Sequence, residues 1–596
     1  MKDSTKVKVL GYDNFNWVSR AWEVSSEHGD ITHDEVSAIL FVTHIPKELD
    51  ALTAPQYTDL HRFEECAGGR HKIPADEALE AIIPNSKDQM EFRKNAILHV
   101  ARILGDEVKI FADFLPDLPK IEDPRAMPAR KTEEYYLPTF DQEQGSTRGN
   151  MIVLEHYWLK TLAVPKSVFE DTSFSILGDR LTTARDRAAQ DQRLVDRSPH
   201  KVDRLQSFQM ISGVMHICMN MIQNMGRNTF GGTNRDAVSM DTLRGVLPNH
   251  SALNAKKIDF YGWLRFMDAI LRALTLAAAM ALLDLATTKQ LDEHKLTRSE
   301  FMSLAEKIVG SFLLPSIDRL EADDVKKLPG QTESGHAVLL FHDLMTMHET
   351  RHSIKHGHPE RLKRMLKYYI PMFYGGGSYN YSNELMELLH NMEHDWLPEC
   401  ANITFDGMLV NTTGKEAAFT EGDIRVEQMN DSIKEKAHGV NASPEYLEKI
   451  TPALGVLHHL TEHIYADLGV EEINSLHAKV KQHVDVRGYV GHLVDYKIFR
   501  WESDTASNHA VVDLYRNGLP RLAGPEGGHA KHLIRHKNRL RKRDDNDSGS
   551  PTVDRQELMF ADRELIDAID FIPADHTITE EPGVDAEEIE DDEEDE

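Results

Sequence analysis

The sequence predicts an α/β protein in which a mixed β-sheet is interrupted by a large helical insertion, with helix predominating overall. Three observations predict this class. Short apolar, β-branched segments typical of strands lie near the N-terminus, at 7–13 and 35–44. A similar segment follows much later, at 173–179. From 241 to 389 the apolar residues instead recur with helical spacing. We therefore expect a sheet assembled from two separated parts of the chain, with most helices outside it.

The composition is that of a globular protein in a reducing compartment. The 596 residues are 40% hydrophobic and 28% charged, enough for a large core in two or three structural units. Three cysteines, far apart and odd in number, argue against a disulfide framework. No apolar leader follows Met1, and the most apolar run, 273–283, is too short to span a bilayer. We expect a nuclear or cytoplasmic protein that is neither secreted nor membrane-associated.

Charge is distributed unevenly. The formal net charge is −30, and we expect the very acidic C-terminal tail, 580–596, to be disordered. The rest of the chain is also acidic, which argues against nucleic-acid binding over the whole surface. A basic run at 531–543 is either a solvated segment or a nucleic-acid or nuclear-import patch. Its candidate nucleic-acid contacts are Lys531, Arg535, Lys537, Arg539, Arg541, Lys542 and Arg543.

The first strand carries the first candidate site residue. Val7 and Val9 begin an alternating pattern that ends at Asp13, where Asn14 supplies turn chemistry. A carboxylate at the end of a buried strand can face a ligand or metal. The alternative is a turn aspartate that caps the next segment. The second strand closes at Pro46, and the two together predict an antiparallel hairpin.

The third strand repeats this form. The segment SFSILGD ends at Asp179, and a helix over 181–192 should follow it. Next comes FQMISGVMHICMNM, at 208–221, which is apolar on all sides and so predicted to be buried. His216 lies inside this run, either as a satisfied core histidine or as a ligand.

A long helical region follows. Gly375 to Gly377 then break the chain, and a helix carrying Glu384 and Glu387 should begin after them. The chain is predicted to begin with a first part of the sheet core (1–45), an irregular and helical insertion (46–170) and a second part of the sheet core (171–222). A helical insertion (223–372), a C-terminal helical part of the core (373–500) and a poorly ordered basic then acidic tail (501–596) should follow.

Three carboxylates from distant parts of the chain form the main candidate site: Asp13, Asp179 and Glu384. Mg²⁺ and Mn²⁺ prefer oxygen ligands, and two such ions can activate water and stabilise a leaving oxygen in phosphodiester cleavage. Bound cations would also reduce the repulsion between an acidic protein and an acidic substrate.

A competing motif lies in the helical region. His348, Glu349 and His352 match H-E-x-x-H, in which two histidines bind zinc and the glutamate acts as base. His394 or Glu384 could supply a third ligand. The alternative for this segment is a histidine-rich surface helix.

Several segments carry a family resemblance: YDNFNW, ILGDRLTTARDR, FQMISGVMHICMN, RHSIKHGHPERLKRMLKYYIPMFYGGGSYNYSNELMELLH and NTTGKEAAFTEGDIRVEQMNDSIK. They resemble an uncharacterised family of mushroom-forming fungi, domain of unknown function 6589. The order of elements is similar to the ribonuclease-H-like core of cut-and-paste transposases. The resemblance implies Asp13 as first metal ligand, Asp179 as second and Glu384 as third, with Glu387 as its competitor.

The expected function follows from this resemblance. An active copy would be a metal-dependent DNA phosphodiester hydrolase or strand transferase with two Mg²⁺ or Mn²⁺ ions. One alternative is a catalytically dead relic that binds nucleic acid or protein as a scaffold. Another is a zinc peptidase using His348 and His352. DNA is the expected partner of an active copy, and the chain could form homo-oligomers.

Overall fold

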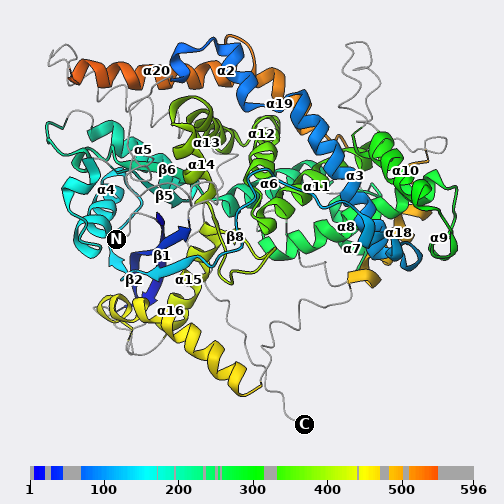
Figure 1. Cartoon of the computed structure of the whole chain (residues 1–596), viewed down its shortest axis with the longest axis horizontal. Coiled ribbons are helices and arrows are strands. Elements are labelled where there is room, and N and C mark those ends of the chain that lie inside the picture. Colours follow the sequence, from blue (N-terminus) through cyan, green and yellow to red (C-terminus); the bar gives the residue numbers. More distant parts are fainter. Residues whose placement is uncertain are drawn as a thin grey trace.

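A long antiparallel pair of strands forms the centre of the sheet in this computed structural model (Figure 1). β1 (Lys6–Ser19) pairs with β2 (Ile31–His44) along its whole length, from Lys6 opposite His44 to Ser19 opposite Ile31. The structure describes residues 6–19, 29–44, 69–170, 172–193, 196–231, 236–247, 253–254, 258–314, 332–438, 442–469, 482–500 and 509–547. The predicted end of the first strand at Asp13 is therefore wrong, because β2 continues the pairing beyond it.

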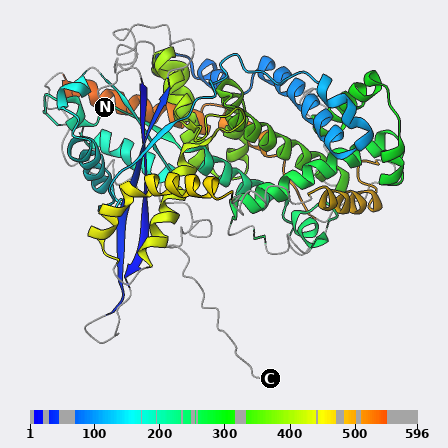
Figure 2. The same cartoon turned by 60° about the horizontal axis from the view of Figure 1, so that its bottom comes forward.

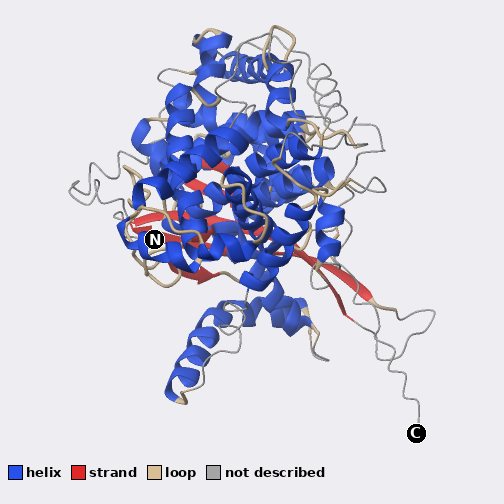
Figure 3. Ribbon diagram, turned by 90° about the vertical axis from the view of Figure 1, so that its right-hand side faces the viewer, coloured by secondary structure: helices blue, strands red, loops and turns tan. Residues whose placement is uncertain are grey.

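The strands form one mixed sheet of order β3-β2-β1-β5-β6, with β4 also paired to β2. β5 (Phe174–Gly178) runs parallel to β1, and β6 (Phe208–Ser212) runs parallel to β5. β3 (Glu133–Tyr136) and β4 (Phe140–Asp141) are antiparallel to β2. The sequence predicted β1, β2 and β5, and it predicted the segment of β6 as a buried run. β3 and β4 were not predicted, because they lie in 46–170, which was expected to be an irregular and helical insertion. The far end of the β1–β2 hairpin reaches beyond the helices (Figures 2 and 3).

Helices cover both faces of the sheet, as the alternation along β1 requires. Tyr12 points to one face, where its hydroxyl donates to Asp186 of α5 (Arg180–Arg193) at 2.8 Å. α4 (Thr147–Glu155) packs on α5 at this face. Gly11 points to the other face, where a Cβ would lie 3.0 Å from Val426 of α15 (Gly422–Ala437). Asp13 shares the parity of Gly11 and therefore the face of α15.

The remaining helices form a larger body beside the sheet (Figure 1). Its main members are α3 (Ser86–Glu107), α6 (Val214–Thr229), α8 (Phe260–Leu282), α10 (Arg298–Ile308), α11 (Glu333–His356), α12 (Pro359–Gly375), α13 (Tyr379–His390), α18 (Gln482–Asp495), α19 (Leu514–Leu522) and α20 (Gly528–Asp547). α16 (Pro444–Asp467) projects away from this body (Figure 3). The mostly helical α/β class is therefore confirmed.

Shorter elements connect these helices: α2 (Ala75–Ile82), α7 (Met240–Val246), α9 (Thr288–Glu293), α14 (Pro398–Asp406), β7 (Leu409–Val410), β8 (Thr420–Glu421), the 3₁₀ turn η1 (Arg70–Lys72) and the π-helical turn η9 (Asn391–Asp395).

Local sequence explains several helix ends. α3 begins with a capping box in which Asn85 and Asp88 bond each other's backbone N–H groups. α11 ends at Gly357, whose φ of +63° lies in the left-handed region that favours glycine. The apolar run at 208–221 divides at Gly213 into β6 and α6, both largely buried. Among the described residues, no helix is both long and apolar enough to cross a membrane.

Candidate active site

The candidate site begins with two aspartates on neighbouring parallel strands. β1 and β5 pair through Val9 with Ser175, Leu10 with Ile176, and Gly11 with Leu177. Extending this register by two residues places Asp13 beside Asp179, which directly follows β5. Side chains at matching positions of parallel strands point to the same face. The structure therefore brings together two of the three carboxylates predicted from the sequence.

The third carboxylate near Asp13 is Glu427, on α15. Burial raises the pKa of Asp13 well above its ordinary value, and the charges of Glu427 and Asp179 raise it further. Burial would also raise the pKa of Glu427, but hydrogen bonding to His216 overcomes this and lowers it. Asp13 and Glu427 are hydrogen-bonded to each other. We infer that they share one proton, held mainly on Asp13.

His216 connects this pair to a further carboxylate. Its Nδ1 lies 3.0 Å from Oδ2 of Asp423, and its Nε2 lies 3.5 Å from Oε1 of Glu427. Burial alone would lower the pKa of His216, but bonds to Asp423 and Glu427 raise it well above the ordinary value. The two carboxylates therefore favour the protonated form of His216. Of the two alternatives raised for this residue, a satisfied histidine fits these contacts, because both ring nitrogens lie beside a carboxylate.

The N-terminus of α6 holds Asp423 in place. The backbone N–H groups of Met215 and His216 donate to its carboxylate at 3.1 Å and 3.0 Å. A carboxylate in this position is stabilised by the free N–H groups and the positive end of the helix dipole. The whole network therefore runs from α6 through α15 to β1.

Glu384 occupies a different environment. Its Oε2 accepts hydrogen bonds from Thr183 and Ser212, at 3.1 Å and 3.2 Å, and its Oε1 pairs with Arg187. Glu387 is committed elsewhere, to Arg70 and His532. The structure thus joins Glu427, and neither Glu384 nor Glu387, to Asp13.

Asp179 also has a local role. Its Oδ1 accepts from the backbone N–H of Thr182 at 2.6 Å, in the first turn of α5. The capping alternative raised for Asp13 thus applies to Asp179, whereas Asp13 lies within a continuing strand. The Asp179 carboxylate also contributes to the raised pKa of Asp13, so Asp179 both caps α5 and lies near Asp13.

The residues fit divalent cations in chemistry but not in arrangement. Carboxylate oxygens are the donors that Mg²⁺ and Mn²⁺ prefer. In the parts of the chain that the structure describes, however, no three His, Cys, Asp or Glu side chains are grouped so that they could hold a metal ion. The shared proton and the bridging His216 satisfy the carboxylates in this conformation.

The H-E-x-x-H segment lies on α11 and is held by ion pairs. Glu349 is fully buried, and its two oxygens accept from Arg361 at 2.9 Å and 2.6 Å and from His99 at 2.6 Å. His352 Nδ1 lies 3.0 Å from Arg361, and His348 Nδ1 lies 3.4 Å from Asp268. The alternative of a surface helix is wrong because Glu349 is buried. A glutamate paired in this way favours a structural role over that of a peptidase base.

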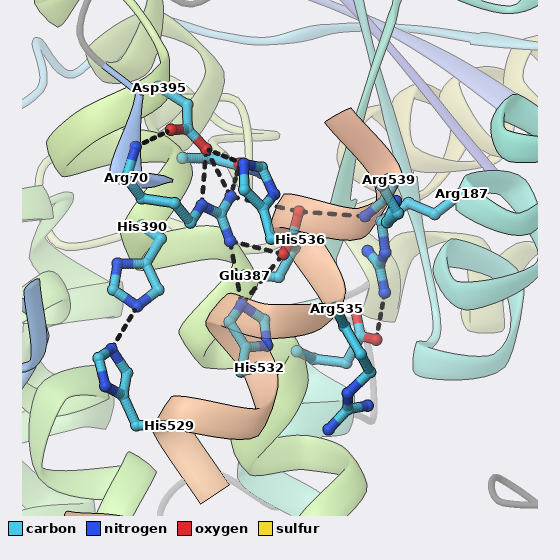
Figure 4. Close-up of polar contacts among 12 residues, drawn as sticks. Arg70, Arg187, Glu387, His390, Asp395, His529, His532, Arg535, His536 and Arg539 are labelled. Carbon is cyan, nitrogen blue, oxygen red and sulfur yellow. Dashed lines mark hydrogen bonds and ion pairs between the residues drawn. The ribbon is translucent and has the colours of Figure 1, made fainter. Parts of the chain in front are cut away.

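The basic run forms much of α20, and part of it is committed to ion pairs (Figure 4). Arg539 pairs with Asp191 of α5 at 2.9 Å. Lys531, Arg535 and Lys537 are exposed. Arg541, Lys542 and Arg543 belong to the helix, but their side chains lie outside the described residues, as does the acidic tail at 580–596.

Glu427 is the main site residue that sequence reasoning missed. The segment GDIRVEQMN predicted a helix that carries two acidic residues, Asp423 and Glu427. Only the packing of Val426 against Gly11 shows which of its turns faces Asp13. His216 was a candidate in the sequence analysis, but no sequence pattern indicated that Asp423 and Glu427 would lie beside it.

The comparisons with known proteins identify a family and no function. A model described as Family of unknown function (DUF6589) matches residues 72–477. Searches of curated proteins and of solved structures found no match to the chain. Because the matched segment is more than half of the 596 residues, the chain belongs to the family of unknown function DUF6589.

Proposed function

We propose that this chain derives from a fungal mobile element, has a ribonuclease-H-like core, and acts on DNA phosphodiester bonds by hydrolysis or strand transfer. The observation that carries the proposal is the register of β1 and β5, which puts Asp13 beside Asp179. The elements that support it are β1 with Asp13, its hairpin partner β2, β5 followed by Asp179, the helices beyond, and α15 with Glu427. In this proposal Glu427 of α15 takes the part expected of Glu384.

Asp13, Asp179 and Glu427 would hold the ions after a rearrangement, because in the described part of the chain these side chains are not grouped for metal binding in the present conformation. Bound Mg²⁺ or Mn²⁺ would supply an activated water and charge stabilisation at the leaving oxygen. For the carboxylates to become ligands, the proton shared by Asp13 and Glu427 has to leave. Asp423 holds His216 at the start of α6 and so limits how far Glu427 can move away from the strand.

DNA is the partner that fits the remaining features. The exposed Lys531, Arg535 and Lys537 on α20 offer positive charge on an otherwise acidic chain. Phosphate contacts of this kind position a duplex without reading its sequence. A nuclear or cytoplasmic location agrees with such a partner.

A second candidate is a catalytically dead scaffold with the same fold. The observation that favours it is that His216 bridges Asp423 and Glu427 in the present conformation, so one of the candidate ligands already has a partner. This candidate retains binding of nucleic acid or protein and lacks turnover.

Cleavage of labelled duplex and single-stranded DNA by the full chain, with Mg²⁺ or Mn²⁺, tests the proposal. We expect cleavage by the native protein and its loss in Asp13→Asn, Asp179→Asn and Glu427→Gln. Asp34→Asn, an exposed change on the neighbouring strand β2, is the matched control and should cleave normally. Absence of cleavage by native protein that still binds DNA favours the scaffold. Undiminished cleavage by Asp13→Asn overturns the proposed site.

A further inference from the structure

Five histidines gather where α20 lies against α13 and the turn η9 (Figure 4). Three come from α20, at spacings that put them on one side of a helix, and two come from the end of α13 and from η9. They are His529, His532, His536, His390 and His394. Neither function proposed above uses these histidines.

The contact between His390 and His529 sets the first condition on protonation. Their Nε2 atoms lie 3.1 Å apart, and both residues are buried, with 0% and 3% exposure. Two imidazole nitrogens form a hydrogen bond only when one carries a proton and the other offers its lone pair. If both rings were cationic, two N–H groups would face each other in a buried contact. This link between α13 and α20 therefore requires at least one neutral histidine.

His532 supplies a second condition. Its Nε2 lies 3.0 Å from Nη1 of Arg70 and 3.2 Å from Oε2 of Glu387. A guanidinium only donates, so the contact with Arg70 requires a lone pair on His532. Protonation would leave only the contact with Glu387 and would place a second cation beside Arg70.

The carboxylates around the cluster already have partners. Arg70 pairs with Glu387 at 2.7 Å and with Asp395 at 2.6 Å, so this buried guanidinium uses both of them. Arg539 reaches Asp191 at 2.9 Å and Glu387 at 3.8 Å. Three carboxylates, Glu387, Asp395 and Asp191, thus share two guanidiniums before any histidine is charged, and each added proton makes the cluster more positive.

The surrounding elements do not alter this balance at the centre. η1 adds His71, and α12 adds Tyr374 near Arg535. On the cluster's own elements, Glu384 of α13 pairs with Arg187, and Glu393 of η9 pairs with Lys363 and opposes the lowering of the pKa of His394. Other charged residues on the packed elements include the exposed Lys72 of η1, the exposed Asp76, Glu77 and Glu80 of α2, Arg516 and Arg521 of α19, and the exposed Lys531, Arg535 and Lys537 of α20 itself.

We propose that the five histidines form an acid-sensitive clamp, which holds α20 on α13 near neutral pH and releases the helix when the medium becomes mildly acidic. The released helix carries the basic run at 531–543, so the clamp controls whether that run is fixed to the body. The geometry of the His390–His529 contact carries the proposal, because this contact does not survive protonation of both rings.

The direction of the pH effect is consistent with this geometry. Burial lowers the pKa of His529 and His536 to about 4, and it lowers the pKa of His532, His390 and His394 as well. A released histidine has a pKa of about 6.5. The docked state is therefore favoured above that value and loses stability as the pH falls towards 4. At about pH 5, the difference between a docked pKa of about 4 and a released pKa of about 6.5 weakens docking roughly 30-fold for each of His529 and His536.

Hydrogen exchange of the full chain tests the clamp, with rates corrected for the pH dependence of intrinsic exchange. Between about pH 7.5 and about pH 5 we expect α20 amides to lose protection at least about 30-fold, while those of α3 keep theirs. In the double variant His529→Gln and His536→Gln, protection of α20 should change far less with pH. His438→Gln, an exposed change at the end of α15, should behave like the native chain.

Two results would overturn the clamp. The first is equal protection of α20 in the native chain at both pH values. This comparison needs no variant, so it holds even if the double variant fails to dock its helix. The second is a loss of protection in the docked double variant as large as that in the native chain, which would assign the pH effect to other groups.

Discussion

Asp13 on β1 and Glu427 on α15 form a hydrogen-bonded pair of carboxylates, in which the pKa of Asp13 is raised and that of Glu427 is lowered. The pair joins the first strand to a helix near the far end of the family match. Two neighbouring carboxylates resist full ionisation, since like charges at short range disfavour each other. This relationship makes the stability of the chain depend on pH in a defined direction.

The first prediction concerns that dependence. The pKa of Asp13 is raised in the folded chain, so its favourable contribution is complete at low pH and is lost as the pH rises through that pKa. Asp13→Asn keeps a hydrogen-bond donor for Glu427 and removes the second charge. Its melting temperature relative to the native chain should therefore increase as the pH is raised. A difference that stays constant with pH, as expected for the control Asp34→Asn, would contradict the shared proton.

A second pH effect should arise on the other face of the sheet. Burial raises the pKa of Asp186 to about 8, although its bond from Tyr12 lowers it. As for Asp13, the stability that Asp186 contributes to the folded chain is present below its unfolded pKa and is lost as the pH rises through about 8. Asp186→Asn still accepts from Tyr12, so it should remove part of the decline in melting temperature between about pH 7 and about pH 9. An unchanged decline would show that Asp186 does not cause it.

The buried pair of Glu349 and Arg361 should be strongly stabilising once formed. Arg361→Met leaves Glu349 buried with His99 and Asn95 but without its guanidinium. Removing one partner of a buried ion pair costs about 3–5 kcal/mol, so the melting temperature should fall by many degrees. Arg298→Met removes an exposed pair with Asp117 and should cost less than about 1 kcal/mol. Similar effects of the two changes would contradict the structural role of Glu349.

Close packing of α12 on α19 gives a fourth prediction. A Cβ on Gly518 would lie 1.8 Å from the carbonyl oxygen of Pro371, so Gly518→Ala must push the two helices apart. Overpacking of this kind typically costs about 1–3 kcal/mol. Gly491→Ala, on α18, meets nothing within 4 Å and should be neutral or stabilising by up to about 1 kcal/mol. Thermal melting of both variants checks this contrast, which would fail if Gly518→Ala melted at the native temperature.

The strands β1, β2 and β5 were predictable because each contains an apolar, β-branched segment beside turn residues, whereas the short β3 and β4 were not predicted. The end of β1 was not, since Asp13 and Asn14 look like a turn until β2 is seen to pair with them. The partnership of Asp13 and Asp179 follows from parallel register, which the sequence suggests only through the repeated strand–Asp form. Glu427 could not be chosen from the sequence, because helix packing rather than spacing brings it to Asp13.

The histidine-rich segments show the same difference between motif and environment. His348, Glu349 and His352 match a zinc motif by spacing, yet burial against Arg361 and His99 gives Glu349 a different role. His394, considered as a third zinc ligand, instead lies in the cluster beside α20, with its ring centroid 5.5 Å from that of His390. Spacing defines a face of a helix, and only the fold decides what that face contacts.

Calorimetric titration with Mn²⁺ tests the central claim, that Asp13, Asp179 and Glu427 form one metal-dependent site. We predict that the native full chain binds Mn²⁺ with micromolar to millimolar affinity and that Asp34→Asn binds equally well. Asp13→Asn, Asp179→Asn and Glu427→Gln should each lose binding, because a site with few carboxylate ligands loses its affinity when any one of them is removed. Glu384→Gln should retain it. Absence of binding by the native chain, or binding unaffected by the three changes, would contradict the site and leave the scaffold as the better account.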